Sequence, residues 1–166
     1  MTPSVAIRHS QPTDLPAILD ILNQAIAEET IAITDQVTLT ERLDWFDQHT
    51  ADRFPILVAD KGRELAGWCS LSAYRPGRKA LRQVVEISYF IHSEQRGRGI
   101  ASQLIEQMIA LCPALGYKTI IAMLLEDNQA SIRLLLRSGF VEWGHMPKIV
   151  NLNGSRLGHL YYGLNL

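Results

Sequence analysis

The sequence predicts one α/β domain in which a mixed sheet of about seven strands carries helices on its faces. Close to half of the 166 residues are hydrophobic, which is enough apolar surface for one core of ordinary size. Short apolar runs alternate with segments whose apolar residues recur at helical spacing. A glycine-rich turn joins one of these runs to one of these helical segments. We therefore expect residues 1–166 to form a single domain.

The first half of the chain is expected to hold three strands and two helices. Strands are predicted at residues 5–9, 54–59 and 65–73, with a turn at Lys61-Gly62-Arg63 between the last two. Pro12-Thr13-Asp14 opens a helix that runs to about residue 28. Its apolar face is formed by Leu15, Ile18, Leu19, Leu22 and Ile26. A polar loop over residues 29–37 leads to a second helix at 38–49.

The second half of the chain is expected to add four strands and two helices. A basic loop at residues 74–82 leads into a strand at 84–91, which is apolar except for Glu86. Helices are predicted at 101–111 and 128–138. The run at 117–125 is continuously apolar, as in strands that are buried on both faces. Two short strands, at 141–143 and 157–164, close the chain.

Composition excludes several classes of protein. The net charge is −1 at pH 7, whereas a nucleic-acid-binding protein usually carries a basic stripe. No apolar run approaches the roughly 20 residues that a membrane helix needs, and Met1 to Arg8 lack the apolar core of a signal peptide. We therefore expect a cytoplasmic protein that binds neither nucleic acid nor membrane. Cys69 and Cys112 lie in apolar segments and are expected to be buried free thiols.

The run Arg96-Gly97-Arg98-Gly99-Ile100-Ala101 has the composition of an anion-binding loop. It lies between a strand that ends at Ile91 and a helix, and a helix N-terminus offers unpaired N–H groups to an anion. The run is not a Walker loop, because no Gly-Lys-Ser/Thr follows, and a dinucleotide fingerprint would need glycine at Ser102. On spacing alone, a glycine-rich turn with surface arginines explains the run equally well.

Two motifs resemble those of the GNAT N-acetyltransferases. The family pattern Gln/Arg-x-x-Gly-x-Gly/Ala is met by Arg96, Gly99 and Ala101, after a strand that reads Glu86-Ile87-Ser88-Tyr89-Phe90-Ile91. Asn128-Gln129-Ala130-Ser131 and the later Gly139-Phe140 resemble the second half of the family site. Within the superfamily, the stretches at 34–38, 45–46, 54–59 and 85–88 resemble the phosphinothricin and methionine sulfoximine acetyltransferases.

The resemblance implies a GNAT fold in which the parallel strands that end at Ile91 and Leu125 splay apart around acetyl-CoA. Backbone groups of Tyr89, Phe90 and Ile91 would contact the pantetheine arm. The pyrophosphate would be bound by the loop and helix start formed by Arg96, Gly97, Arg98, Gly99, Ile100, Ala101 and Ser102. Asn128 would hydrogen-bond the arm near the thioester, and Ser131 would also bind the cofactor. Acetyl-CoA would be the cosubstrate. No metal is expected, because no set of His, Cys and carboxylate side chains has metal-ligand spacing.

Glu86 is the predicted general base. A carboxylate inside an apolar strand rarely lacks a partner or a purpose, and partial burial would raise its pKa toward the working range. The resemblance agrees, since Glu86 matches the glutamate proposed as base in the phosphinothricin group. The alternatives are a glutamate that pairs with Arg82 or Arg75, and one that binds the substrate ammonium.

The group that protonates the leaving thiolate is not evident from the sequence. Many GNAT enzymes have tyrosine at the position of Leu135, and leucine cannot donate a proton. Either water or another group then protonates the thiolate, or the thiolate leaves without a proton donor. Tyr117 is an alternative donor.

The resemblance also implies that the acceptor is a small amine, bound by Tyr74, Arg75, Arg78, Glu86, Ile87 and Ser88. Arg75 is the first candidate for a carboxylate or oxyanionic group, because a guanidinium binds such groups bidentately. The loop at 30–34 would add apolar contact, and a homodimer is expected. We therefore predict direct transfer of acetyl to the amine of a small amino acid or analogue. A protein or peptide N-acetyltransferase and a non-catalytic acyl-CoA-binding module are the alternatives.

Overall fold

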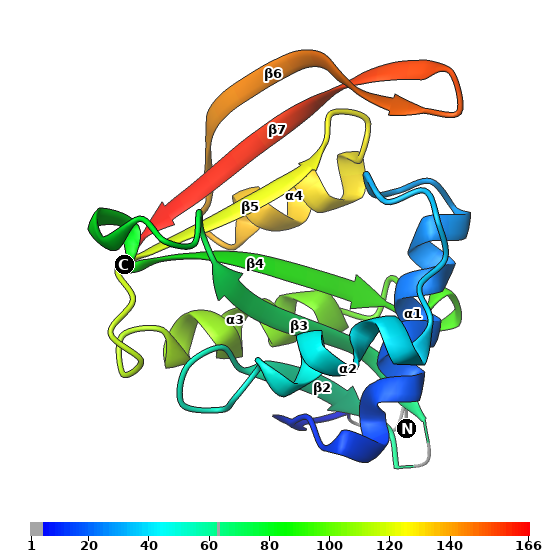
Figure 1. The fold of residues 1–166 in the computed structure, drawn as a ribbon, viewed down its shortest axis with the longest axis vertical. Helices are drawn as coiled ribbons and strands as arrows, with labels where there is room; N and C mark the ends of the chain where they lie inside the picture. Colours follow the sequence, from blue (N-terminus) through cyan, green and yellow to red (C-terminus); the bar gives the residue numbers. More distant parts are fainter. Residues whose placement is uncertain (1–4, 63) are drawn as a thin grey trace.

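The computed structural model describes residues 5–62 and 64–166, and it shows a seven-stranded sheet with helices on both faces (Figure 1). The strand order is β1-β2-β3-β4-β5-β7-β6. The strands are β1 (Ala6–His9), β2 (Ile56–Asp60), β3 (Leu65–Ala73), β4 (Val84–Ile91), β5 (Thr119–Leu125), β6 (Val141–Leu152) and β7 (Ser155–Asn165). The helices are α1 (Leu15–Ala27), α2 (Leu39–Asp47), α3 (Ile100–Leu111) and α4 (Gln129–Arg137). The predicted fold class and the predicted order of elements are confirmed.

The one parallel contact in the sheet is the short pairing of β4 with β5. Residues 84–86 pair with residues 119–121, and the two strands then diverge, as Figure 1 shows. Both strands keep their outer partners beyond that point. β4 stays paired with β3 through Ile91, and β5 stays paired with β7 through Leu125. The sheet therefore opens in its middle, between two strands that are each held in place on the other side.

Two hydrophobic cores cover the two faces of the sheet. On one face, α3 contributes Leu104, Ile105 and Met108, and α4 contributes Leu135. On the other face, α1 packs Ile18, Ile21, Leu22 and Ile26 against Ile56, Val58 and Trp68. The Trp68 indole N–H is satisfied by the Ile18 carbonyl oxygen at 3.0 Å. Residues of β4 alternate between the two cores, so this strand presents side chains to both faces.

Helix α2 is held by its cap rather than by a buried face. The Thr38 hydroxyl accepts a hydrogen bond from the Glu41 amide at 3.4 Å, and the Glu41 carboxylate accepts one from the Thr38 amide at 2.8 Å. This reciprocal box satisfies two amides that the helix itself leaves unpaired. None of the α2 residues is fully buried, although Trp45 and Phe46 pack at the edge of the α1 core.

The C-terminal hairpin is much longer than predicted. The expected strands at 141–143 and 157–164 are parts of β6 and β7, which pair across nearly their full lengths with register shifts after Glu142 and Met146. The full strand β6 has no clear strand pattern in the sequence. It contains Pro147, Lys148 has a positive φ, and most of its residues are exposed. The Trp143 ring of β6 packs directly on Gly163 of β7. A Cβ at Gly163 would overlap this ring, so the contact requires glycine.

Among the described residues, none of the helices is both long and apolar enough to cross a membrane. Cys69 and Cys112 are buried and free, as predicted. Arg63 of the predicted turn lies outside the described residues.

Candidate functional site

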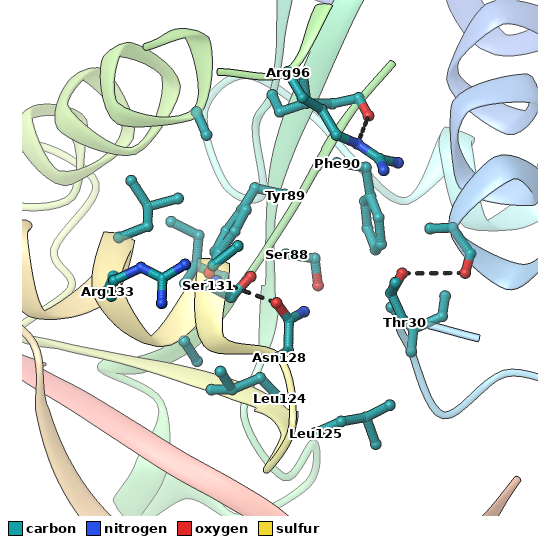
Figure 2. A pocket seen from close by; sticks show the side chains of 18 of the residues that line it. Thr30, Ser88, Tyr89, Phe90, Arg96, Leu124, Leu125, Asn128, Ser131 and Arg133 are labelled. Carbon is teal, nitrogen blue, oxygen red and sulfur yellow. Dashed lines mark hydrogen bonds between the residues drawn. The ribbon is translucent and has the colours of Figure 1, made fainter. Parts of the chain in front are cut away.

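A cavity of about 500 Å³ occupies the opening between β4 and β5 (Figure 2). This volume is within the usual range for a small-molecule site. Its walls come from the α1–α2 loop, β4, the glycine loop, the start of α3, β5, α4 and β7. The lining residues are Ala25, Thr30, Ile31, Ala32, Ile87, Ser88, Tyr89, Phe90, Ile91, Gln95, Arg96, Gly97, Gly99, Ile100, Ala101, Ser102, Ala122, Met123, Leu124, Leu125, Asn128, Ala130, Ser131, Arg133, Leu134, Arg137 and His159.

The inner edges of β4 and β5 give the cavity two rows of main-chain groups. Beyond Glu86 and Ile121 no ladder joins the two strands, yet both remain extended to Ile91 and Leu125. Main-chain N–H and C=O groups on such edges need partners. An extended ligand can pair with an open strand edge as an added strand would. The opening is therefore suited to a long, narrow chain with amide groups of its own.

The glycine loop leads from the end of β4 to the first residue of α3, at one end of this opening. Gly99 caps α3 with φ of 75°, and Gly97 has φ of 74°. A Cβ at either position would meet nothing within 4 Å, so glycine is required by backbone conformation and not by packing. The first amides of α3 point away from the helix and lack intrahelical acceptors. The loop therefore gives this end of the cavity the geometry that suits an anion.

Arg96 lines the cavity and is tied to helix α1. Its guanidinium forms an ion pair with the Glu28 carboxylate at 2.7 Å, and its Nε donates to the Ile91 carbonyl oxygen at 3.4 Å. The amide of Ser93 donates to the Gln24 side chain at 3.0 Å, which adds a second link between this loop and α1. Arg98, the other arginine of the loop, is exposed and is not among the lining residues.

Helix α4 forms the wall on the opposite side of the cavity from α1 in Figure 2. Asn128 caps this helix, and its side-chain oxygen accepts from the Ser131 amide at 3.1 Å. The Asn128 side-chain NH₂ is then the group that can donate to a ligand. Two lining residues of α4, Arg133 and Arg137, were missed by the sequence analysis. Their spacing of four places them on one helix face with Ala130 and Leu134, and this periodicity is the signal that could have found them.

The charges on the cavity wall are all of one kind. Arg96, Arg133 and Arg137 line it, and its described lining includes neither aspartate nor glutamate. The chain as a whole has 17 acidic and 16 basic residues. The cavity therefore attracts anions although the protein carries almost no net charge.

The face of the cavity toward α1 is mostly apolar. Phe90 lies on this side and packs against Trp68 with ring centroids 4.8 Å apart. Thr30 also borders this side, where its hydroxyl donates to the Ala25 carbonyl oxygen at 3.1 Å (Figure 2). His159 of β7 borders the cavity opposite Leu125, and its ring meets that of Tyr161 at 5.8 Å. Burial lowers the pKa of His159 below the ordinary histidine value, which favours the neutral imidazole.

Glu86 is on the same face of β4 as Ser88 and Phe90. It is the last residue of β4 that pairs with β5. The cavity lining begins at Ile87, so Glu86 is just behind it. Burial raises the pKa of the Glu86 carboxyl above its ordinary value. The ion pairs of the described residues do not include Glu86, and neither Arg75 nor Arg82 pairs with it.

Three residues assigned to the acceptor by resemblance lie outside the cavity lining. Tyr74, Arg75 and Arg78 belong to the loop after β3, and Arg75 has a positive φ of 51°. Ile87 and Ser88, assigned to the same group, do line the cavity. This loop lies at the end of the sheet where β4 and β5 are still paired, which is also the end where Glu86 is located.

Proton donors near the opening are few. Leu135 is fully buried in the core beneath α4 and offers none. The Tyr117 hydroxyl donates to the Arg53 carbonyl oxygen at 2.6 Å, and Tyr117 does not line the cavity. Tyr89 does line it, with its hydroxyl beside the Ser131 side chain (Figure 2). Burial raises the pKa of Tyr89 to about 12, which keeps this hydroxyl protonated at neutral pH.

The described part of the chain shows no set of side chains placed to bind a metal ion. Over residues 5–62 and 64–166, no group of three or more His, Cys, Asp and Glu side chains is arranged to hold a metal ion. Glu126, which follows β5 directly, pairs with His145 at 2.8 Å, and its carboxylate accepts from the Gly158 amide at 2.6 Å. These contacts fix the end of β5 to the hairpin.

Comparisons with known proteins agree with this geometry. The model of the acetyltransferase (GNAT) domain matches residues 4–141. The L-methionine sulfoximine/L-methionine sulfone acetyltransferase of Pseudomonas aeruginosa is 36% identical over 98% of this chain and 95% of that protein. A phosphinothricin acetyltransferase from Sinorhizobium meliloti, crystallised with AcCoA, superposes with TM-score 0.92 and 27% identity, covering 98% of this chain and 89% of that one. A ribosomal-protein-alanine N-acetyltransferase from Brucella melitensis superposes with TM-score 0.90 and 33% identity, covering 97% of this chain and 99% of that one.

Proposed function

The chain belongs to the GNAT acetyltransferase family, and from that premise we propose that the cavity holds acetyl-CoA while its amine acceptor enters from the α1 side. The protein is an acetyl-CoA-dependent N-acetyltransferase that acts on small amino acids or their analogues. The observation that carries the proposal is the open pair of strand edges that leads to a glycine-bounded helix N-terminus.

The pantetheine arm would lie in the opening between β4 and β5. Its two amides would pair with main-chain groups of Tyr89, Phe90 and Ile91, and Asn128 would donate to the arm near the thioester. The pyrophosphate would accept hydrogen bonds from the amides of residues 97–102. The support for this placement is that all these residues, except Arg98, line one continuous cavity.

Catalysis would begin with removal of a proton from the acceptor ammonium. Glu86 is the proposed base, directly or through a water molecule, because its carboxyl is on the acceptor face and its pKa is raised by burial. The free amine then attacks the thioester carbonyl carbon. As the C–S bond breaks, the Tyr89 hydroxyl would donate a hydrogen bond to the sulfur, which develops negative charge. The attacking nitrogen also loses a second proton, which leaves the neutral amide. One of the two protons would pass through Glu86 and solvent to the leaving CoA thiolate, and the other would pass to solvent.

The acceptor would be held near Ser88 and Phe90, beneath the loop that contains Thr30. The lining of this half is mostly apolar, and a cavity of about 500 Å³ in all favours a compact amino acid over a folded protein. Arg75 remains a proposed ligand for an acceptor carboxylate from the loop before β4. The Brucella relative, named for a ribosomal protein, makes a protein N-terminus the second candidate acceptor.

We also propose a homodimer. Support comes from the exposed apolar side chains along β6, among them Val141, Trp143, Met146 and Ile149. An exposed apolar row on an edge strand is usually covered by a partner. Light scattering at micromolar concentration would measure the mass, and a monomer would contradict the proposal.

Release of free CoA thiol should be measured with acetyl-CoA and a panel of acceptors. The panel should include methionine sulfone, methionine sulfoximine, phosphinothricin, common amino acids and short peptides with N-terminal alanine. We expect the highest kcat/KM with one of the small acceptors. Turnover with peptides alone would identify a peptide acetyltransferase. Tight CoA binding without turnover of any acceptor would indicate a non-catalytic binding module.

A further inference from the structure

We propose that Arg133 and Arg137 of α4 form a separate subsite for the 3′-phosphate of the cofactor. This inference rests on the proposed binding of acetyl-CoA in the cavity. Both residues line the cavity, on the same wall as Ser131 and Leu134. Figure 2 shows Arg133 beside Ser131, among the side chains that surround the opening.

The cofactor has more phosphate than the glycine loop can bind. The loop and the first turn of α3 offer main-chain amides to the pyrophosphate. CoA also carries a phosphomonoester on the 3′ carbon of its ribose, with a charge of roughly −1.5 to −2 at pH 7. A dianion of this kind binds most strongly to guanidinium groups that can donate two hydrogen bonds each. A second cationic site beyond the loop would therefore strengthen the binding of this phosphate.

Arg96 is less suited than the two α4 arginines to bind the 3′-phosphate. It is engaged by Glu28 at 2.7 Å and by the Ile91 carbonyl oxygen, on the α1 side of the loop. The cations in the ion pairs of the described residues are Arg8, Arg96 and His145, so neither α4 arginine takes part. Arg133 and Arg137 are therefore the lining guanidinium groups that have no carboxylate partner in this part of the chain.

Helix energetics also argue for a bound anion at Arg133. Two like charges four residues apart on one helix face repel each other and slightly destabilise an isolated helix. Arg137 is the last residue of α4, where the helix dipole favours a cation. Arg133 is in the middle of the helix and gains nothing from the dipole. An anion between the two side chains would turn their repulsion into a shared attraction.

The test compares CoA with 3′-dephospho-CoA, which lacks only the 3′-phosphate. Dissociation constants of both ligands should be measured by calorimetry for the wild type, Arg133→Gln, Arg137→Gln and the double variant. Both arginines are exposed, so the variants should fold, and thermal melts would verify this. Arg82→Gln is the control, because it removes an exposed arginine at the start of β4, where β4 and β5 are still paired.

We expect the wild type to prefer CoA, and the double variant to lose about ten- to a hundredfold in CoA affinity. Its affinity for 3′-dephospho-CoA should change less than about twofold, so that the preference disappears. Arg133→Lys should restore part of it, and Arg82→Gln should leave it intact.

Equal losses for both ligands would overturn the inference, since the arginines would then serve the adenine, the pyrophosphate or the helix itself. Unchanged affinities would overturn it too, because the arginines would be surface cations only. A wild type that binds neither ligand would instead contradict the proposed function, so the two failures are distinguishable.

Discussion

At the scale of single residues, Glu86 differs from every other carboxylate of the chain in its surroundings. It is on an apolar strand, its pKa is raised by burial, and the described residues include no ion-pair partner for it. A structural glutamate is normally paired, whereas a base must be free to take a proton. Its place just behind Ser88 allows contact with the acceptor amine, directly or through one water molecule.

Replacement of Glu86 by Gln should lower kcat/KM at neutral pH by about a hundredfold or more, since the base is removed while the side chain keeps its shape. In the wild type, kcat/KM should fall as the pH drops through a pKa above the ordinary glutamate value, because only the carboxylate form accepts a proton. This acidic limb should be absent in Glu86→Gln. Steady-state rates between pH 5 and 9 measure both effects, and near-wild-type activity of the variant would exclude Glu86 as the base.

Tyr89→Phe tests the proposed donor to the leaving sulfur. We expect kcat to fall about a hundredfold while the KM for acetyl-CoA changes less than threefold, since the hydroxyl acts as the C–S bond breaks. Tyr117→Phe is the matched control, because that hydroxyl is bound to the Arg53 carbonyl oxygen and is outside the cavity. A fall in kcat for Tyr117→Phe but not for Tyr89→Phe would reverse the assignment.

At the scale of elements, the loop between β4 and α3 works through the conformation of its main chain. Gly97 and Gly99 both adopt left-handed conformations with open space where a Cβ would be. A side chain there would cost about 1–2 kcal/mol in backbone strain and would turn the following amides away from the ligand.

Gly99→Ala should therefore raise the KM for acetyl-CoA at least tenfold and lower stability slightly. Gly116→Ala is the control, because Gly116 has a similar φ of 83° and equally open space where a Cβ would be. Gly116 lies in the turn before β5 and does not line the cavity. We expect Gly116→Ala to lower the melting temperature by a similar amount and to leave KM unchanged. Equal KM values for the two variants would show that the loop conformation does not determine cofactor binding.

The sequence predicted most elements because each has a strong local signal. The stripe of α1, the continuous apolar run of β5 and the two glycines before α3 are readable without any tertiary information. The length of β6 was not readable, because its exposed residues and Pro147 match no strand pattern. Arg133, Arg137 and His159 were missed for a different reason. They come from α4 and β7 and line the same cavity as the glycine loop because β4 and β5 part. The helical spacing of the two arginines is readable from the sequence, but no local pattern shows that their helix face borders this opening.

At the scale of the whole molecule, one charged cluster joins the N-terminal strand to the rest of the fold. Arg8 of β1 donates to the Asp14 carboxylate at 2.7 and 3.0 Å and to the Asp60 carboxylate at 2.8 Å. Asp14 also accepts from the Gln11 amide at 2.7 Å and is nearly buried. Burial alone would raise the pKa of Asp14, but the bonds from Arg8 and Gln11 outweigh it, and the pKa is lowered.

Asp14→Asn should cost about 1–3 kcal/mol of unfolding free energy at pH 7, because Arg8 loses a charged partner at a buried site. A lowered aspartate pKa contributes stability above its unfolded value of about 3.9, and this contribution is lost as the pH falls through the folded pKa. The gap between wild type and Asp14→Asn should thus be constant above about pH 5 and should narrow below about pH 4. Urea titrations from pH 2.5 to 7 measure it, and a gap that widens in acid would contradict the sign.

The cavity between β4 and β5 is lined by elements from both faces of the sheet, and this affects how two substrates can bind together. One set of cavity walls, from α3 and α4, is on one face, and the other, from the α1–α2 loop, is on the opposite face. In the proposed complex, the cofactor and the amine would therefore contact walls from opposite faces of the sheet and meet in the opening between β4 and β5. An enzyme with this layout can run without a covalent acetyl intermediate of its own.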